Sequence, residues 1–141
     1  MAHEIPGTTI TRVANAVLTQ YKCVKLANTG RAVAIAATTD RPIGILQDKT
    51  PSAALSDGTF GAVTIMCDGI SKLLAGTGGL AVGDLVGVDG DGDGVVVALN
   101  STSTYVAATS SLYVIGQCIG AAVAGGLATV LFSTMNPPRN Q

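Results

Sequence analysis

Charged side chains are scarce in this 141-residue chain, which carries 8 Lys and Arg residues against 9 Asp and Glu residues, for a net charge of −1. The basic residues are scattered and form no stripe. This argues against direct nucleic-acid binding, because nucleic-acid-binding domains concentrate Lys and Arg on one face. The mean hydropathy of +0.48 is high for a protein that stays monomeric in water. We therefore expect part of the surface to be buried in an assembly.

Residue types that commonly perform catalysis are also few. His3 is the only histidine and Glu4 the only glutamate, and both lie at a terminus, where no rigid scaffold would fix a general base. The three cysteines, Cys23, Cys67 and Cys118, are far apart and form no CxxC motif. They are expected to be buried free thiols rather than zinc ligands or a redox pair. We therefore expect no enzyme, no cofactor, and no catalytic or metal site.

We also expect no secretory signal, because the opening segment, MAHEIPGTTITR, has no apolar core. One uncharged stretch, residues 112–132, is long enough to span a bilayer and contains a GxxxG motif that begins at Gly116. However, Gln117 and a Gly-Gly pair interrupt this stretch, and its large residues are mostly β-branched, which favours strands. We expect an intracellular origin and no membrane contact.

Glycine, alanine, valine and threonine are abundant, which predicts short strands joined by tight turns. The chain also repeats itself, because the stretch from Leu18, LTQYKCVKLANTGRAVAIA, aligns with the stretch from Leu80, LAVGDLVGVDGDGDGVVVA. In each copy apolar residues alternate on both sides of a Gly-rich centre, as in a β-hairpin. A polar loop, an Ile-Gly strand and a closing strand then follow. The aligned apolar pairs are Val24 with Val86, Leu26 with Val88, Val33 with Val95, and Ile35 with Val97.

This repeat predicts an all-β fold, a small antiparallel β-sandwich or barrel built from two similar hairpin-containing halves. We expect one domain, with an N-terminal arm over residues 1–16, a β core over residues 17–133 and a C-terminal tail over residues 134–141. A chain of this length can bury enough surface to fold without disulfides.

The stretch Asp89–Gly94 reads DGDGDG, and its spacing fits the opening of a calcium-binding EF-hand loop. The motif is incomplete, because its twelfth position is Asn100, where a bidentate Glu is expected. In the first copy of the repeat the same place is taken by ANTGR, Ala27 to Arg31, which has no carboxylate. We therefore predict a hairpin turn without a structural metal. Weak, adventitious cation binding at this turn stays open.

Three stretches resemble the capsid cement, or head decoration, proteins of tailed bacteriophages. They are CDGISKLLAGTGGLAVGDLVGVDGDGDGVVV from Cys67, RPIGILQD from Arg41, and YVIGQCIGAAVAGGLATVLF from Tyr113. The resemblance implies a structural protein of the virion that binds and stabilises the outer surface of an expanded capsid, commonly as a trimer. It also implies that the major capsid protein is the partner, and that the chain is made in the host cytoplasm and carried on the capsid exterior.

The two terminal segments lie outside the repeat and are the expected contact arms, with disordered tails as the alternative. The residues that we expect to touch the capsid are Ile5, Ile10, Arg12, Met135 and Arg139. A β-rich carbohydrate-binding or adhesin-like module is the alternative function. The sequence contains no tryptophan, so only its three tyrosines could stack on sugars.

Overall fold

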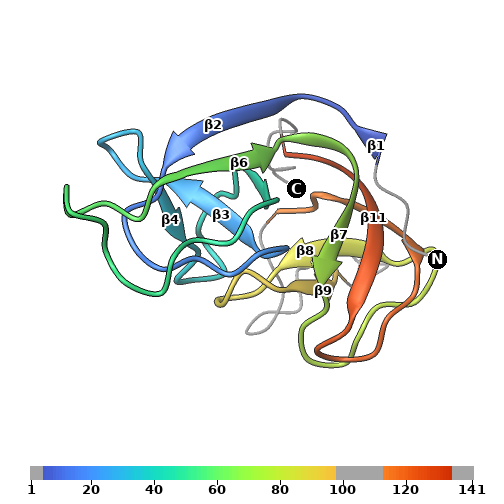
Figure 1. Cartoon of the computed structure of the whole chain (residues 1–141). Coiled ribbons are helices and arrows are strands. Elements are labelled where there is room, and N and C mark those ends of the chain that lie inside the picture. Colours follow the sequence, from blue (N-terminus) through green and yellow to red (C-terminus); the bar gives the residue numbers. More distant parts are fainter. Residues whose placement is uncertain (1–4, 98–112, 135–141) are drawn as a thin grey trace.

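A computed structural model describes residues 5–97 and 113–134, and this part of the chain consists of strands and connecting loops, with no helix. The strands form one six-stranded and one five-stranded sheet, and every strand pair in them is antiparallel. The all-β sandwich expected from the sequence is therefore confirmed (Figure 1). The strands are β1 (Ile5–Pro6), β2 (Thr9–Val13), β3 (Cys23–Leu26), β4 (Ala32–Ala34), β5 (Gly44–Leu46), β6 (Ala62–Met66), β7 (Asp68–Leu74), β8 (Leu85–Val88), β9 (Gly94–Val96), β10 (Gly116–Gly120) and β11 (Leu127–Ser133).

The two sheets have the same topology. The five-stranded sheet has the order β2-β6-β5-β3-β4, and the six-stranded sheet has the order β7-β11-β10-β8-β9 with the short strand β1 added beside β7. Each strand from β2 to β6 thus has its equivalent in the strand five places later. We call residues 9–67 the first half and residues 68–134 the second half. The sequence prediction of two similar halves, each containing a hairpin, is confirmed.

The turns of the two hairpins are closed by the same backbone hydrogen bond. In the first half the amide of Ala27 donates to the carbonyl oxygen of Arg31 at 2.9 Å, and in the second half the amide of Asp89 donates to that of Asp93 at 3.0 Å. Arg31 and Asp93 therefore occupy the same place in the two copies. This pairing agrees with the sequence alignment, in which ANTGR stands opposite the Asp-Gly run.

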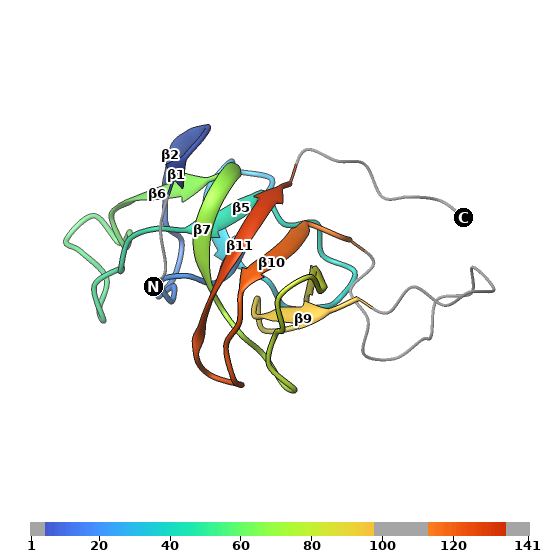
Figure 2. The ribbon, with the colours of Figure 1, turned by 90° about the vertical axis from the view of Figure 1, so that its right-hand side faces the viewer.

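Each sheet curls until its first and last strands approach each other. In the first half Ala14, just after β2, forms a parallel bridge with Ala32 of β4; in the second half Ala75, just after β7, forms one with Gly94 of β9. Each bridge is a single residue pair, so neither sheet closes into a barrel. The halves meet directly in the chain, because β6 passes into β7 through Cys67 alone (Figures 1 and 2).

The three inner strands of the five-stranded sheet, β3, β5 and β6, carry buried side chains on both faces. Val24, Leu46 and Ile65 point into a core inside the first half, which also contains Ala14, Leu18, Ala32 and Val63. The residues next to them in the chain point the opposite way and pack against the second half. These residues form a row across three strands, Cys23 of β3, Ile45 of β5 and Met66 of β6. Their side chains are at most 3% exposed, and they join the core of the second half, which includes Leu73, Val86, Val130 and Phe132.

The N-terminal arm expected over residues 1–16 is wrong for residues 5–13, because β1 pairs with β7 and β2 pairs with β6. The backbone amides and carbonyls of these two strands are hydrogen-bonded to neighbouring strands, whereas those of a free arm would have no such partners.

The described part of the uncharged stretch over residues 112–132 includes the β10–β11 hairpin. No helix in the described residues is long and apolar enough to cross a membrane.

Close backbone approach requires glycine at the start of β10. A Cβ atom at Gly116 would collide with the carbonyl oxygen of Leu131 on β11, and one at the equivalent Gly44 would collide with that of Met66. We expect Gly116→Ala to lower the free energy of unfolding by about 2 kcal/mol, because the two strands must separate to make room.

Urea unfolding followed by circular dichroism measures this effect. Gly90→Ala is the matched control, because a Cβ atom at Gly90 would lie 3.8 Å from its nearest neighbour, an ordinary contact distance. Equal stabilities of the two variants would contradict the assigned strand contact.

Candidate functional site

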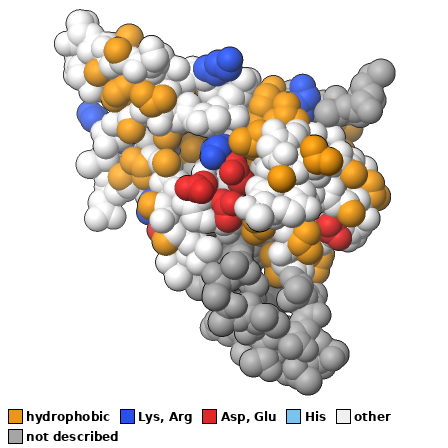
Figure 3. All heavy atoms as spheres, turned by 90° about the horizontal axis from the view of Figure 1, so that it is seen from below, with side chains coloured by type: hydrophobic (Ala, Val, Ile, Leu, Met, Phe, Trp, Pro, Cys, Tyr) orange, Lys and Arg blue, Asp and Glu red, His pale blue; other side chains and the backbone are white. Residues whose placement is uncertain are grey.

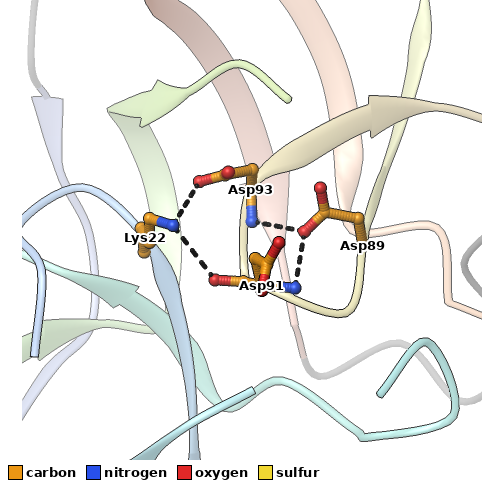
Figure 4. A network of polar contacts seen from close by, with 4 residues as sticks. All are labelled: Lys22, Asp89, Asp91 and Asp93. Carbon is orange, nitrogen blue, oxygen red and sulfur yellow. Dashed lines mark hydrogen bonds and ion pairs between the residues drawn. The ribbon is translucent and has the colours of Figure 1, made fainter. Parts of the chain in front are cut away.

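A group of four charged residues lies where the β8–β9 turn meets the first half (Figure 4). Lys22, just before β3, places its Nζ atom 3.1 Å from Oδ1 of Asp93 and donates to the carbonyl oxygen of Asp91 at 3.3 Å. The amide of Cys23 donates to the carbonyl oxygen of Gly92 at 2.8 Å. In the view from below, acidic side chains lie beside one basic side chain near the middle of the face (Figure 3). The Asp-Gly turn thus fastens the second half to the first.

Two of the three carboxylates of this turn, those of Asp89 and Asp93, are directed at protein groups, and the Asp91 side chain is exposed. Asp89 Oδ1 accepts hydrogen bonds from the amides of Asp91 and Asp93, both at 2.9 Å, so it holds the turn in shape. Gly92 has a φ of 85°, and a Cβ atom there would lie 2.7 Å from the carbonyl oxygen of Cys23. Glycine is therefore required for the turn to approach β3. This geometry is that of a hairpin turn docked on a neighbouring strand.

Burial governs the protonation of the side chains at this junction. The Asp93 side chain is 17% exposed, and burial raises the pKa of its carboxyl, while the ion pair with Lys22 acts in the opposite direction. Its Oδ1 atom is buried, and the Lys22 ammonium group at 3.1 Å is the partner that compensates its charge. Burial, and then the charges of Asp93 and Asp89, raise the pKa of the Cys23 thiol. Cys23 is thus a neutral core residue.

No described group of three or more His, Cys, Asp or Glu side chains is arranged to hold a metal ion. A depression of about 200 Å³ lies beside the junction and is lined by Val17, Lys22, Ala34 and Asp91, among others. This volume is below the roughly 300–1,000 Å³ typical of small-molecule sites. The three cysteines are all buried and unpaired in disulfides. The junction therefore offers structural contacts and an ion pair.

The three described residues that were predicted to touch a capsid do not form one patch. Ile5 on β1 is 59% exposed at the edge of the six-stranded sheet. Arg12 on β2 is exposed at the edge of the other sheet. Ile10, on the same strand, packs against the core of the first half, because it lies beside the buried Ile65. Met135 and Arg139, like His3, lie outside the described residues.

Sequence reasoning missed the surface that carries most of the exposed aliphatic side chains. Ten large hydrophobic residues are exposed in the described chain, and seven of them belong to the six-stranded sheet and its connections. Hydrophobic side chains are visible on several parts of the face in Figure 3. Only the high mean hydropathy signalled such a surface, and it gave no location. The seven residues are Ile5, Val82, Val96, Ile119, Val123, Leu127 and Leu131.

The fold has a counterpart among solved structures. The chain superposes on the N base of the head fiber gp8.5 of bacteriophage phi29 with a TM-score of 0.61 and 19% sequence identity. The superposition covers 90% of this chain and 94% of that one. The likeness shows that the two proteins share a fold over nearly their whole lengths. No protein-family profile matches the chain, and no curated protein matches it in sequence.

The Asp-Gly turn is expected to need no metal. Asp89 binds the amides of its own turn and Asp93 faces Lys22, so neither carboxylate has to be neutralised by a cation. We expect the melting temperature to be the same with and without a chelator such as EDTA, measured by circular dichroism. A large fall on chelation, restored by added calcium, would contradict the assignment of this turn.

The ionisation of Asp93 is expected to reduce stability. Because the folded pKa of this carboxyl is raised, folded Asp93 binds its proton more tightly than unfolded Asp93. The free energy of unfolding therefore falls as the pH rises from about 4, the ordinary Asp value, to the raised value. We expect Asp93→Asn to match the wild type below this window and to be more stable above it.

Urea unfolding of both proteins at a series of pH values measures the difference. Asp91→Asn is the control for loss of one charge from the same turn, because the Asp91 side chain is exposed. If Asp93→Asn is less stable than the wild type at neutral pH while Asp91→Asn is unchanged, the ion pair with Lys22 outweighs the burial of the carboxylate.

Proposed function

We propose that this chain is a structural protein of a bacteriophage virion. The observation that carries the proposal is the shared fold with the base of a phage head fiber, which extends over 90% of the chain. The sequence resemblance to capsid cement proteins points to the same class of particle and is independent of that superposition. A junction built from core packing and one half-buried ion pair also suits a role in which the protein is a rigid component.

Within that class, we propose a cement role, in which the chain binds the outer surface of the expanded capsid as a homotrimer. A protein that binds the assembled shell more tightly than its loose subunits stabilises the shell through its binding free energy. Several chains of one trimer bind together, so modest contacts by each chain suffice. The major capsid protein is the proposed partner, and the capsid exterior is the proposed location.

The proposed contacts need revision in the light of the fold. Ile10 contributes to the core, so among the described candidates only Ile5 and Arg12 can meet a capsid surface. Removal of residues 1–9 is not a clean test, because it would delete β1 and the hydrogen bond from the Thr8 amide to Asp68. Point substitutions leave these contacts in place.

Co-sedimentation with undecorated, expanded heads tests the cement role. We expect the full-length chain to pellet with the heads at a saturating copy number and to raise the temperature at which they rupture. Arg12→Glu should weaken binding by about tenfold, the size expected for a reversed charge at an interface. Lys49→Glu, an exposed charge reversal in a loop, is the matched control.

The outcomes separate the two levels of the proposal. Failure of the full-length chain to pellet with heads of its own phage would refute the cement role. Equal binding by Arg12→Glu and Lys49→Glu would refute only the contact at Arg12.

A further inference from the structure

The outer face of the six-stranded sheet carries a row of side chains equivalent to the buried row of the first half. Leu85 on β8 pairs with Gln117 on β10, and Gln117 pairs with Leu131 on β11. The row continues to Ile70 on β7. It takes the same place in its sheet as the row Cys23–Ile45–Met66, which the second half covers. Here Leu131 is 50% exposed, although it corresponds to Met66, which is 3% exposed.

Equivalent hydrogen bonds fix which charged residue flanks this second row. The carbonyl oxygen of Lys22 accepts from the amide of Leu46 at 2.9 Å, and the carbonyl oxygen of Asp84 accepts from the amide of Cys118 at 2.9 Å. Asp84 therefore stands beside the exposed row where Lys22 stands beside the buried one. The side chain at this position is basic in the first half and acidic in the second.

The partner of Lys22 also has a counterpart. Lys22 binds Asp93 at the end of the β8–β9 turn, and Arg31 occupies the equivalent place at the end of the β3–β4 turn. Each of the two equivalent positions therefore carries a basic side chain in one half and an acidic side chain in the other. The junction inside the chain joins Lys22 to Asp93. The equivalent positions that this junction does not use carry Asp84 and Arg31. Opposite charges on complementary positions are what a repeated interface requires.

We propose that two copies of this chain associate head to tail, so that the outer face of one copy's second half packs on the first half of the next copy. In this contact Asp84 of one copy pairs with Arg31 of the next, and the row Leu85–Gln117–Leu131 is covered as Cys23–Ile45–Met66 is covered within the chain. The inference deepens the proposed trimer by naming its interface, and it does not depend on binding to a capsid.

The two charged side chains are available for such a pair. Arg31 is exposed, and its Nη1 atom lies 3.3 Å from Asn15 Oδ1. Asp84 is half-buried and uses Oδ2 to accept from the Ala81 amide at 2.8 Å. Neither Arg31 nor Asp84 takes part in the ion pairs of Lys22 with Asp93 and of Lys25 with Asp40. Hydrogen bonds from Thr59 lower the pKa of the exposed Asp57 carboxyl, and Arg31 does lie near enough for its charge to lower that pKa further.

The contact joins two different surfaces, so it is heterologous and must close into a ring or extend into a filament. A closed ring of three chains fits the proposed trimer, and it places six similar halves in succession, each covering the outer face of the one before. The protein that covers this outer face is therefore a second copy of the chain. Only another first half presents the turn, with Arg31 at its end, that is equivalent to the turn packed on the buried row.

Charge-reversal variants test the pair in the absence of heads. Native mass spectrometry and sedimentation velocity should show a trimer for the full wild-type chain. Asp84→Lys and Arg31→Glu alone should each raise the dissociation constant about tenfold or more, because each places like charges together. The double variant carrying both changes should recover most of the lost affinity.

A second pair of variants tests the apolar row. Leu131→Asp should dissociate the oligomer, whereas Leu55→Asp, at a loop residue of similar exposure (47% against 50%), should not. Circular dichroism spectra and melting curves establish that each variant is folded. If Asp84→Lys is unfolded through loss of its bond to Ala81, Asp84→Asn, which keeps an acceptor, replaces it, with Arg31→Glu as the partner variant.

Three results would overturn the proposal. These are a wild-type chain that stays monomeric at high concentration, single reversals without effect, and a double variant no better than the single ones. A monomer that still pellets with heads would refute this interface and leave the cement role standing. A trimer that does not pellet would do the opposite.

Discussion

The three inner strands of the five-stranded sheet, β3, β5 and β6, carry buried side chains on both faces, and the arrangement of the whole chain depends on this burial. One face encloses a core with Val24, Leu46 and Ile65, and the other presents the row Cys23–Ile45–Met66 to the second half. Each large aliphatic side chain moved from water into such a core contributes about 1.5–3 kcal/mol. A sheet that would be half-solvated in isolation gains this free energy only when the second half is in place.

The junction between the halves adds precision to this packing. The β8–β9 turn contacts β3 through backbone hydrogen bonds and the pair of Lys22 with Asp93. Removing the Asp93 carboxylate from water costs free energy that an exposed carboxylate does not lose. The raised pKa of Asp93 reflects this cost. We interpret the pair as fixing where the turn sits on the strand, with hydrophobic burial as the larger source of stability.

The sequence predicted the fold class and the repeat, because alternation around a Gly-rich turn is a local pattern and occurs twice. It did not predict β2, whose TITRV segment has few apolar residues and pairs with β6, which lies 49 to 57 residues further along the chain. It also placed Ile10 on the surface, because the burial of that residue depends on the same distant pairing. The contacts at the junction could not be predicted from the sequence for a related reason. Lys22 and Asp93 meet only when two complete halves are packed together. Within the Asp-Gly run, the missing twelfth ligand was enough to favour a turn over a calcium loop.

The passage of β6 into β7 through a single residue has a consequence for how the molecule loses its structure. Cys67 is buried, and its carbonyl oxygen accepts hydrogen bonds from the amide and the hydroxyl group of Thr134 at the end of β11. The two halves therefore have no flexible linker that would let one open while the other stays folded. Melting of β7 would pull on β6 and expose Met66 and Ile45, so we expect cooperative, all-or-none unfolding of a chain built from two similar halves.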